Sequence, residues 1–584
     1  MNILGLSCFY HDAAACLVRD GVVIAAAEEE RFSRRKHDAG FPLGAIAYCL
    51  AAGGLAPADL DYVVFYEKPL VKFERILASY VATFPRSRVA FTRAMQTWLT
   101  EKLWIRPTIR ARLPYRGEVL FGDHHLSHAA SAYYPSPYED AAIVTVDGVG
   151  EWTTTTIGHG RGLDVELVKE IRYPHSLGLL YSAFTTYLGH EANEGEYKVM
   201  GMAAYGEPRY ADQVRQLVQL GDDGSFQLDM RYFAYHASLE GVARRFLDLF
   251  GPPRAPDDGL EPRTADIAAS IQRVTEDVLV AIARHARQLT GARYLVMAGG
   301  VALNCLANTR ILQEAGFDGV WIQPAAGDSG GAVGAALHLY HMVLRGPRAA
   351  PLRNAYLGPA YDAEAIETFL RARDIGYERL GERDLVETTA RLLADGQVVG
   401  WYQGRMEFGP RALGARSILA DPRDPAMKDV LNEKIKHRER FRPFAPAVLL
   451  EAAADYFDLG CPSPYMLFTA RARPERQAAI PSVTHVDGTA RLQTVTPEEN
   501  GRFAALLQAF GRRTGVPVLI NTSFNVRGEP IVCTPAEAYN CFAHTDMDYL
   551  VLGDYLIDRA AKRPIAPYAG HARVRAEAEA LVLH

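Results

Sequence analysis

Two histidines that lie four residues apart are the strongest candidates for metal chemistry in this sequence. On a helix, side chains at this spacing project from one face, so His124 and His128 could bind one ion. Asp147 and Asp328 each stand where a predicted strand runs into a glycine-rich turn, and they could complete the ligand set. Two imidazoles and two carboxylates without sulfur suit Fe(II), Mn(II) or Zn(II). The same histidine spacing also occurs in purely structural helices.

Glycine-rich turns after predicted strands form a second group of candidates. One strand ends at Gly299 and Gly300, and another ends at a turn that contains Gly330 and leads into an alanine-rich helix. Glycines at such turns allow backbone N–H groups to approach an anion at the N-terminus of the helix. Because several of these turns occur in one region, and two carry an acidic residue, the pattern favours a nucleotide-binding cleft.

Cationic side chains concentrate in a third stretch. Three arginines lie among the glycines of residues 404–417, and Lys436 and Arg442 follow. Arginine and lysine beside tight turns suit phosphate groups, or a transferring phosphoryl or acyl-phosphate centre. For the basic residues 434–440 alone, a solvated helix face is the alternative.

The elements that must position these side chains occur twice. Residues 2–7 form a predicted strand that leads into a hairpin over residues 13–27, and residues 141–146 begin a second strand with its own hairpin. Each opening leads into a helical pattern, most clearly at residues 177–188. The repetition predicts two related lobes with mixed α/β structure.

A break rich in glycine and proline at residues 345–351 separates this region from a second α/β region. We therefore expect one domain over residues 1–350 and another over residues 351–584. Residues 566–584 are expected to form a loose tail. The predicted strands of the second region include 398–402, 518–521 and 549–552.

Two charged stretches allow more than one interpretation. Residues 86–116 are basic and contain Trp98 and Trp104, so they could lie on an anionic membrane surface or grip an amphiphilic acceptor. The alternative is a helical insertion whose aromatic side chains pack inward and whose arginines are solvated. The acidic run at residues 28–30 is interpreted as a solvated strand end or turn.

Length and composition exclude several classes of protein. The 584 residues are too many for one hydrophobic core, and 63 Lys and Arg against 69 Asp and Glu give a net charge of −6, which does not favour a nucleic-acid partner. Seven cysteines without a CxxC pair argue against a disulfide framework and a thiolate zinc site. No apolar run reaches the length of a membrane span, and no basic segment precedes the first apolar stretch. We expect a cytoplasmic protein.

Taken together and in order, these motifs resemble those of the NodU/CmcH family of O-carbamoyltransferases. The resemblance covers about the first 560 residues. The residues that carry it are YHDAAA at 10–15, EEERF at 28–32, HHLSHAASA at 124–132, VDG at 146–148, GGVALN at 299–304, GPRALG at 409–414 and RPFAP at 442–446.

The resemblance implies a two-step enzyme. The first domain would be a two-lobed domain of the actin-like ATPase superfamily, similar to the enzyme that makes threonylcarbamoyladenosine in tRNA, and the second would be a YrdC-like α/β domain. The second domain would convert carbamoyl phosphate and ATP into carbamoyl-adenylate, with Mg²⁺ accompanying the ATP. The first would pass the carbamoyl group to a hydroxyl of a sugar, an antibiotic or another natural product, and AMP would leave. An enclosed passage between the domains would protect the labile carbamoyl-adenylate from water.

The resemblance also assigns roles to residues. It implies an iron site at His124, His128, Asp147 and Asp328. His11 would be the base that takes a proton from the attacking hydroxyl, with a near-neutral pKa. The residues implied in the adenylate site of the first domain are Gly148, Gly150, Gly299, Gly300, Gly330 and Asn304. Those implied to hold carbamoyl phosphate and the ATP phosphates are Arg411, Lys436, Arg442 and Arg491, with Arg411 and Lys436 also catalytic.

Two other functions stay open from the sequence alone. One is a tRNA-modifying enzyme that transfers a threonylcarbamoyl group, which would need a nucleic-acid surface. The other is a nucleotide-gated interaction module without transferase activity, in which replacing His124 with alanine would leave function intact. A monomer and a homodimer are both compatible with the sequence.

Overall fold

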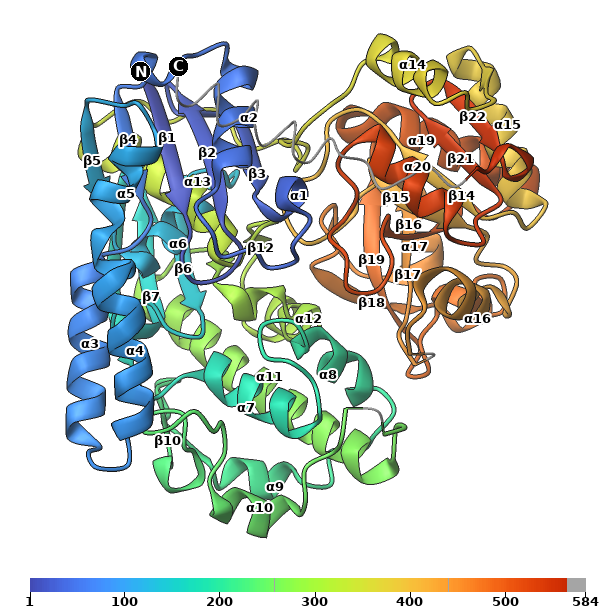
Figure 1. The fold of residues 1–584 in the computed structure, drawn as a ribbon. Coiled ribbons are helices and arrows are strands. Elements are labelled where there is room, and N and C mark those ends of the chain that lie inside the picture. The colour runs from blue at the N-terminus through green and yellow to red at the C-terminus, as the bar shows by residue number, and fades with distance from the viewer. Residues whose placement is uncertain (257, 440, 564–584) are drawn as a thin grey trace. The chain divides into compact units, whose positions relative to one another are not determined.

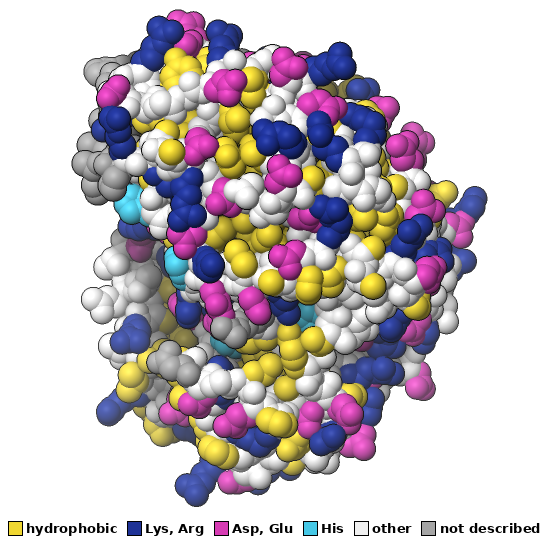
Figure 2. Space-filling view, turned by 90° about the vertical axis from the view of Figure 1, so that its right-hand side faces the viewer, with side chains coloured by type: hydrophobic (Ala, Val, Ile, Leu, Met, Phe, Trp, Pro, Cys, Tyr) yellow, Lys and Arg dark blue, Asp and Glu magenta, His cyan; other side chains and the backbone are white. Residues whose placement is uncertain are grey.

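The computed structural model of the protein describes residues 1–256, 258–439 and 441–563. The tail expected at residues 566–584 lies outside the described residues. None of the helices in this part of the chain has both the length and the apolar character that crossing a bilayer requires. On the face drawn in Figure 2, cationic and anionic side chains are interspersed with hydrophobic ones.

The described residues divide into two compact units. Figure 1 colours the chain by residue number, from blue at the N-terminus to red at the C-terminus. The first unit comprises Met1–Ala25 and Ala39–Leu352, and the second comprises Ala26–Asp38 and the residues from Arg353 onward. The second unit is therefore discontinuous in sequence, because a short segment near the N-terminus belongs to it.

This segment, Ala26–Asp38, is packed within the second unit. The backbone N–H of Ala26 donates to Leu357 O at 3.1 Å. Glu28 and Glu29 are only 4% and 8% exposed. The acidic run does lie at a strand end and turn, but it is buried, so its interpretation as solvated is wrong.

Two five-stranded sheets repeat one topology, and their strands lie in the first unit except for residues 26–28 at the end of one strand, which belong to the second. Their strands are β1 (Asn2–Ser7), β2 (Ala14–Arg19), β3 (Val22–Glu28), β4 (Tyr62–Phe65) and β5 (Glu118–Phe121), and β6 (Asp140–Val146), β7 (Thr153–Arg161), β8 (Asp164–Arg172), β11 (Tyr294–Ala298) and β12 (Gly319–Ile322). β1 pairs antiparallel with β2 and parallel with β4, and β6 pairs antiparallel with β7 and parallel with β11. The orders are β3-β2-β1-β4-β5 and β8-β7-β6-β11-β12. The two related α/β lobes predicted from the sequence are confirmed.

The turn between β2 and β3 shows how local sequence sets this topology. Asp20 and Gly21 have φ values of +48° and +80°. Positive φ at both central residues is the pattern of a type I′ turn, whose twist matches that of the paired strands. The turn therefore folds β3 back onto β2 at the residues where the sequence predicts it.

The helices of the first unit connect and cover these sheets. They are α2 (Leu43–Gly53), α3 (Pro69–Ala82), α4 (Arg88–Thr100), α5 (Ile105–Arg112), α6 (His124–Tyr133), α7 (Leu177–Tyr187), α8 (Glu196–Ala203), α9 (Ala211–Arg215), α10 (Arg244–Phe250), α11 (Pro262–Thr290), α12 (Cys305–Glu314) and α13 (Asp328–His338). A small hairpin of β9 (Val218–Leu220) and β10 (Phe226–Leu228) completes the unit.

In each lobe one helix follows the last strand: α6 follows β5, and α13 follows β12. These two helices pack against each other. A Cβ atom added to Gly334 of α13 would lie 1.7 Å from Ser127 O of α6, and one added to Gly5 of β1 would lie 1.9 Å from Ala332 O of α13. Glycine at these two positions therefore permits close contact of α13 with both α6 and β1. This packing brings together the first turns of α6 and α13, which carry predicted metal ligands.

The basic aromatic stretch at residues 86–116 forms helices α4 and α5, which together with α3 are inserted between β4 and β5. Figure 1 shows α3 and α4 as an antiparallel helical hairpin. Trp98 is 5% exposed, as a helical insertion with inward aromatic side chains predicts. Trp104 is 55% exposed, so inward packing is wrong for this side chain.

One ten-stranded mixed sheet forms the framework of the second unit. Its strands are β13 (Glu378–Arg379), β14 (Val399–Tyr402), β15 (Arg416–Ala420), β16 (Ala445–Leu449), β17 (Phe457–Asp458), β18 (Phe468–Ala472), β19 (Thr489–Val495), β20 (Val518–Ser523), β21 (Tyr549–Leu552) and β22 (Tyr555–Asp558). The order is β13-β22-β21-β14-β15-β20-β16-β19-β18-β17. β14 is parallel to β21 and β16 is parallel to β19.

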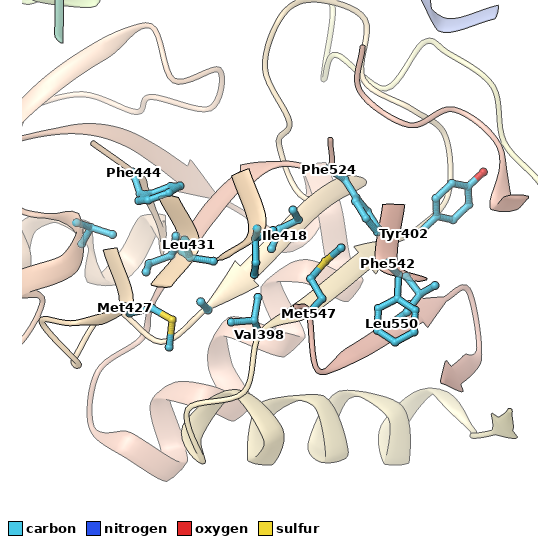
Figure 3. Packing of buried hydrophobic residues seen from close by; sticks show 14 of the residues in the cluster. Val398, Tyr402, Ile418, Met427, Leu431, Phe444, Phe524, Phe542, Met547 and Leu550 are labelled. Carbon is cyan, nitrogen blue, oxygen red and sulfur yellow. The ribbon is translucent and has the colours of Figure 1, made fainter. Parts of the chain in front are cut away.

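Helices cover both faces of this sheet. They are α14 (Ala363–Ala372), α15 (Glu382–Ala394), α16 (Met427–Val430), α17 (Leu450–Tyr456), α18 (Pro474–Gln477), α19 (Pro497–Thr514) and α20 (Pro535–Ala543), and the segment adds α1 (Glu30–Ser33). α15 and α19 pack on one face around Trp401 and Leu419. The other face holds Tyr402 and Ile418, packed with Phe542 of α20 (Figure 3). The alternation follows the two-residue period of a strand.

Candidate functional site

The four predicted metal ligands meet inside the first unit. His124 and His128 lie on α6, Asp147 follows β6, and Asp328 is the first residue of α13. One ligand atom of each lies within 4.8 Å of the others, and all four side chains are buried. His124 Nε2 is 3.1 Å from Asp147 Oδ2 and 3.6 Å from Asp328 Oδ1. His128 Nε2 is 3.5 Å from Asp328 Oδ1.

The donor atoms of this cluster fit a bound cation. His128 Nε2 and Asp328 Oδ1 are buried and make no hydrogen bond to the described residues. Buried polar atoms normally have hydrogen-bond partners, so these two atoms indicate a bound ion at the centre of the cluster. A four-coordinate ion with bonds of about 2.1 Å holds its ligand atoms roughly 3.4 Å apart, which is close to the separations observed here.

The pKa shifts of His124 and Asp147 also favour a bound cation. Burial lowers the pKa of His124, but the charge of Asp328 and hydrogen bonds to Asp147 and Glu67 outweigh it and hold the pKa well above its usual range. Burial alone would raise the pKa of Asp147, yet the two imidazoles hold it well below its usual range. The buried carboxylates thus need positive charge beside them, which a divalent cation supplies.

The buried ion pair of Glu67 and Lys72 contacts His124 at Nδ1, the ring nitrogen that does not face the two aspartates. Glu67 Oε2 lies 3.4 Å from His124 Nδ1 and accepts a hydrogen bond of 2.6 Å from Lys72 Nζ. Burial raises the pKa of Glu67, but Lys72 and His124 lower it to about 2. A carboxylate behind a ligating imidazole fixes the orientation of the ring. This pair was not predicted from the sequence, although Glu67 lies two residues after the end of β4 and Lys72 lies in the helix that follows.

His11 lies beside the cluster, in the loop after β1. Its Nδ1 is 2.9 Å from Asp12 Oδ2, and its Nε2 is 3.9 Å from Asp328 Oδ2. Burial lowers the pKa of His11, but Asp328 and Asp12 raise it to about 9. The structure therefore brings the predicted base to the predicted ligands, while its pKa differs from the near-neutral value expected.

Three of the predicted nucleotide-site glycines shape the ligand cluster. A Cβ atom on Gly150 would lie 2.8 Å from the side chain of His124. Gly299 has a φ of +93°, and its Cβ atom would lie 2.2 Å from Val146 O. The N–H of Gly300 donates to Asp147 Oδ1 at 2.9 Å. This N–H therefore orients a predicted metal ligand.

The remaining predictions for the nucleotide site fall nearby. A Cβ atom on Gly330 would lie 2.2 Å from Ala325 O, so the first turn of α13 needs glycine. A Cβ atom on Gly148 would make only an ordinary contact, 3.9 Å from the side chain of Leu179, and the Gly148 carbonyl accepts a hydrogen bond from Ser176 Oγ. Asn304 caps α12 and pairs with Gln272. Its side chain already has partners within the protein.

In the second unit, the loop that carries Arg411 is fixed by buried polar groups. Glu407 Oε1 accepts hydrogen bonds of 2.6 Å from Leu413 N and 2.8 Å from Ala415 N. The side chain of Gln493 on β19 donates to Leu413 O at 2.8 Å. The loop therefore lies against β19, which also carries Arg491.

Lys436 is buried at the end of a π-helical turn that follows α16. Its Nζ donates to Ser523 O, and to Asn525 Oδ1 at 2.9 Å. Burial and the neighbouring charges of Arg438 and Arg442 lower its pKa well below the usual range. The structure thus brings Lys436 and Arg442 close together and places the amine on the turn after β20.

The three arginines among the glycines have different surroundings. Arg416 is fully buried, donates to backbone carbonyls that include Gln403 O, and lies 3.6 Å from the centre of the Tyr402 ring. Arg405 donates to Leu357 O at 2.6 Å. These two support the fold, whereas Arg411 is half-buried on its loop. Of the three, Arg411 is the one to which the resemblance assigns a phosphate-binding role.

Fold and site together define an α/β enzyme with two units, one with a buried candidate metal centre and one with a fixed arginine loop. Two family descriptions match the chain, "Carbamoyltransferase N-terminus" over residues 2–337 and "Carbamoyltransferase C-terminus" over residues 390–559. The chain belongs to the carbamoyltransferase family.

Individual relatives agree with this assignment. The chain is 50% identical to the uncharacterized protein sll1178 of Synechocystis sp., over 96% of this chain and 97% of that protein. It is 38% identical to the nodulation protein NolNO of Sinorhizobium fredii, over 97% of this chain and 83% of that protein. Component A of the (R)-2-hydroxyglutaryl-CoA dehydratase of Acidaminococcus fermentans, a solved structure, is 13% identical with a TM-score of 0.31, over 58% of this chain and 97% of that one. A score of that size carries no functional argument.

Proposed function

We propose that this carbamoyltransferase is ATP-dependent and that each unit performs one step. In the second unit, carbamoyl phosphate loses phosphate to water, and the carbamate displaces pyrophosphate from ATP to give carbamoyl-adenylate. In the first unit, the carbamoyl group passes to a hydroxyl of a sugar or another natural product, and AMP leaves. The observation that carries the proposal is the buried cluster of two histidines and two aspartates in a chain of this family.

The residues of the first unit suit the transfer step. His124, His128, Asp147 and Asp328 would hold Fe(II), or Mn(II) or Zn(II), which as a Lewis acid would polarise the carbamoyl carbonyl. His11 would accept the proton of the attacking hydroxyl. Asp328 contributes most to raising the pKa of His11, so a cation held by that carboxylate would return the imidazole toward neutral pKa.

The residues of the second unit suit the activation step. Arg411, Arg442 and Arg491 would offset the charge of carbamoyl phosphate and of the ATP phosphates, with Mg²⁺ accompanying ATP. Lys436 would join them by exchanging its contacts to the turn after β20 for a phosphate oxygen. The adenylate would then be held in the first unit near Gly148, Gly299 and Gly330, where glycine permits close approach of the backbone.

The test is a complete reaction with purified protein. Carbamoyl phosphate, ATP, Mg²⁺ and a panel of sugars and hydroxylated natural products would be incubated, and AMP, pyrophosphate and carbamoylated products followed by mass spectrometry. We expect carbamoyl phosphate to stimulate the formation of AMP and pyrophosphate, and one class of acceptor to gain a carbamoyl group. Pyrophosphate formation that never depends on carbamoyl phosphate would refute the proposal.

A further inference from the structure

Two buried side chains of the segment Ala26–Asp38 hold both backbone polar groups of Gly409. Gly409 N donates to Glu28 Oε1 at 2.9 Å, and Arg31 Nη2 donates to Gly409 O at 2.9 Å. Arg31 Nε donates in turn to Glu28 Oε2 at 3.1 Å. The three residues therefore close a ring of hydrogen bonds, which we call the Glu28–Arg31 bracket.

The bracket is buried, and its charges are compensated within it. The side chains of Glu28 and Arg31 are 6% and 3% exposed. Arg31 Nη1 lies 2.7 Å from Glu30 Oε1, so the guanidinium contacts two carboxylates and one carbonyl. A buried ion pair is costly unless each group finds partners, and here the shared partner is the backbone of a single glycine.

Gly409 needs this support because of its conformation and its place. Its φ is +121°, a value that residues with a side chain rarely adopt. It stands two residues before Arg411, and on the far side of Arg411 the carboxylate of Glu407 accepts the N–H groups of Leu413 and Ala415. Buried carboxylates thus hold the backbone on both sides of Arg411.

The same segment holds a second turn of the unit. Arg34 Nη1 donates to Ile531 O at 2.6 Å, Arg34 Nη2 donates to Pro530 O at 2.7 Å, and Arg34 also lies 3.3 Å from Glu537. A segment that begins only 26 residues into the chain therefore fixes two turns of the unit that contains the activation chemistry.

We propose that Glu28 and Arg31 are positioning residues of the activation site: their bracket on Gly409 sets the direction in which Arg411 meets the phosphate of carbamoyl phosphate. The proposal rests on the phosphate-binding role of Arg411 proposed above. A loop fixed before the substrate arrives loses less entropy on binding, and a misplaced cation loses much of its effect on the bound anion.

The test measures pyrophosphate formation from carbamoyl phosphate and ATP by the full-length protein. Glu28→Gln keeps the size of the side chain but removes the charge that pairs with Arg31. We expect it to raise the KM for carbamoyl phosphate about 10-fold, with a smaller change in kcat. Glu28→Asp keeps the charge but shortens the side chain by one methylene group, so we expect a KM between those of the wild type and Glu28→Gln. This variant replaces Glu28→Gln in the test if the latter is unstable.

A double variant separates positioning from a general loss of structure. If the bracket acts through Arg411, the effect of Glu28→Gln on KM disappears when Arg411 is already alanine, so the two changes are not additive. Asp421→Asn is the matched control: it breaks another buried contact of a carboxylate with an arginine, at the opposite end of β15 from Arg416. It should leave the KM unchanged.

The outcomes distinguish this inference from the function on which it rests. If Arg411→Ala leaves the KM for carbamoyl phosphate unchanged, the proposed phosphate site is wrong whatever Glu28 does. If Arg411→Ala raises the KM but folded Glu28→Gln and Glu28→Asp proteins do not, the bracket is not a positioning device. Additive effects of Glu28→Gln and Arg411→Ala would also overturn it.

Discussion

At the scale of single residues, the candidate metal centre depends on groups one layer behind its ligands. The N–H of Gly300 fixes Asp147, and Glu67 stands behind His124 with Lys72 as its counter-ion. Such outer contacts decide ring orientation and ligand basicity, and they commonly change metal affinity by about 10-fold to 100-fold.

We therefore expect Glu67→Gln to weaken metal binding without removing a ligand. The glutamine cannot balance Lys72 or polarise His124, so the dissociation constant for Fe(II) or Mn(II) should rise at least about 10-fold. Anaerobic metal titration with elemental analysis of the protein measures it. Glu74→Gln, which changes an exposed carboxylate on α3, should bind as the wild type does. Equal affinities for wild type and Glu67→Gln would contradict a supporting role for Glu67.

The residue-scale site was partly predictable from the sequence. The four candidate ligands could be selected because the spacing of His124 and His128 and the places of Asp147 and Asp328 at strand-to-glycine turns suit ligation by imidazole and carboxylate. The partners of Asn304 and the backbone role of Gly300 could not, because both depend on contacts that only the folded chain creates. The pKa of His11 also depends on Asp328, which is more than 300 residues away in sequence.

At the scale of elements, the close contact between α6 and α13 sets the geometry of the ligands. His124 and His128 come from one helix and Asp328 from the other, so any shift between these helices moves the ligands apart. The strands β1, β6 and β11, which precede His11, Asp147 and Gly299, were predictable within one or two residues because they are continuous apolar runs bounded by turns. The contact of the two helices was not, since Gly334 reads as an ordinary small residue in an alanine-rich helix.

Replacing Gly334 with alanine tests this contact. The added methyl group would lie 1.7 Å from Ser127 O, so the helices must separate. We expect a loss of stability of at least about 2 kcal/mol, measured by thermal unfolding, together with reduced metal content. Gly259→Ala, where the added atom meets nothing within 4 Å, should change stability by less than about 0.5 kcal/mol. A Gly334→Ala protein with wild-type stability would show that α13 can shift away from α6 at no cost in stability, which would contradict the importance of their close contact.

At the scale of the whole molecule, the second unit contains a piece of the N-terminal region. Sequence patterning placed the boundary of the two regions near residue 350, but it did not place Ala26–Asp38 with the second region. Helix and strand propensities and hydrophobic periodicity describe the local structure of tens of neighbouring residues, whereas Glu28 and Gly409 are 381 positions apart in the sequence. The acidic run at residues 28–30 gave no sign of this, because the sequence alone predicts a solvated strand end or turn there.

A cut between the two regions should therefore not release them. With a protease site inserted after the exposed residue Ala350, we expect the two cleaved fragments to elute together in size-exclusion chromatography. The contacts of Arg31 and Arg34 hold the segment in the second unit. Replacing both arginines with glutamine should lower the urea concentration that separates the fragments. Fragments that separate in buffer alone would contradict the assignment of the segment.

The discontinuity also has a consequence during synthesis. A ribosome adds about 5–20 residues per second, so Glu28 leaves it roughly 20–80 s before Gly409 is made. Throughout that interval the nascent chain carries Glu28, Arg31 and Arg34 without the backbone groups that will bury them. The early segment must therefore wait for the region made last, and that region cannot reach its native form without a segment translated at the start.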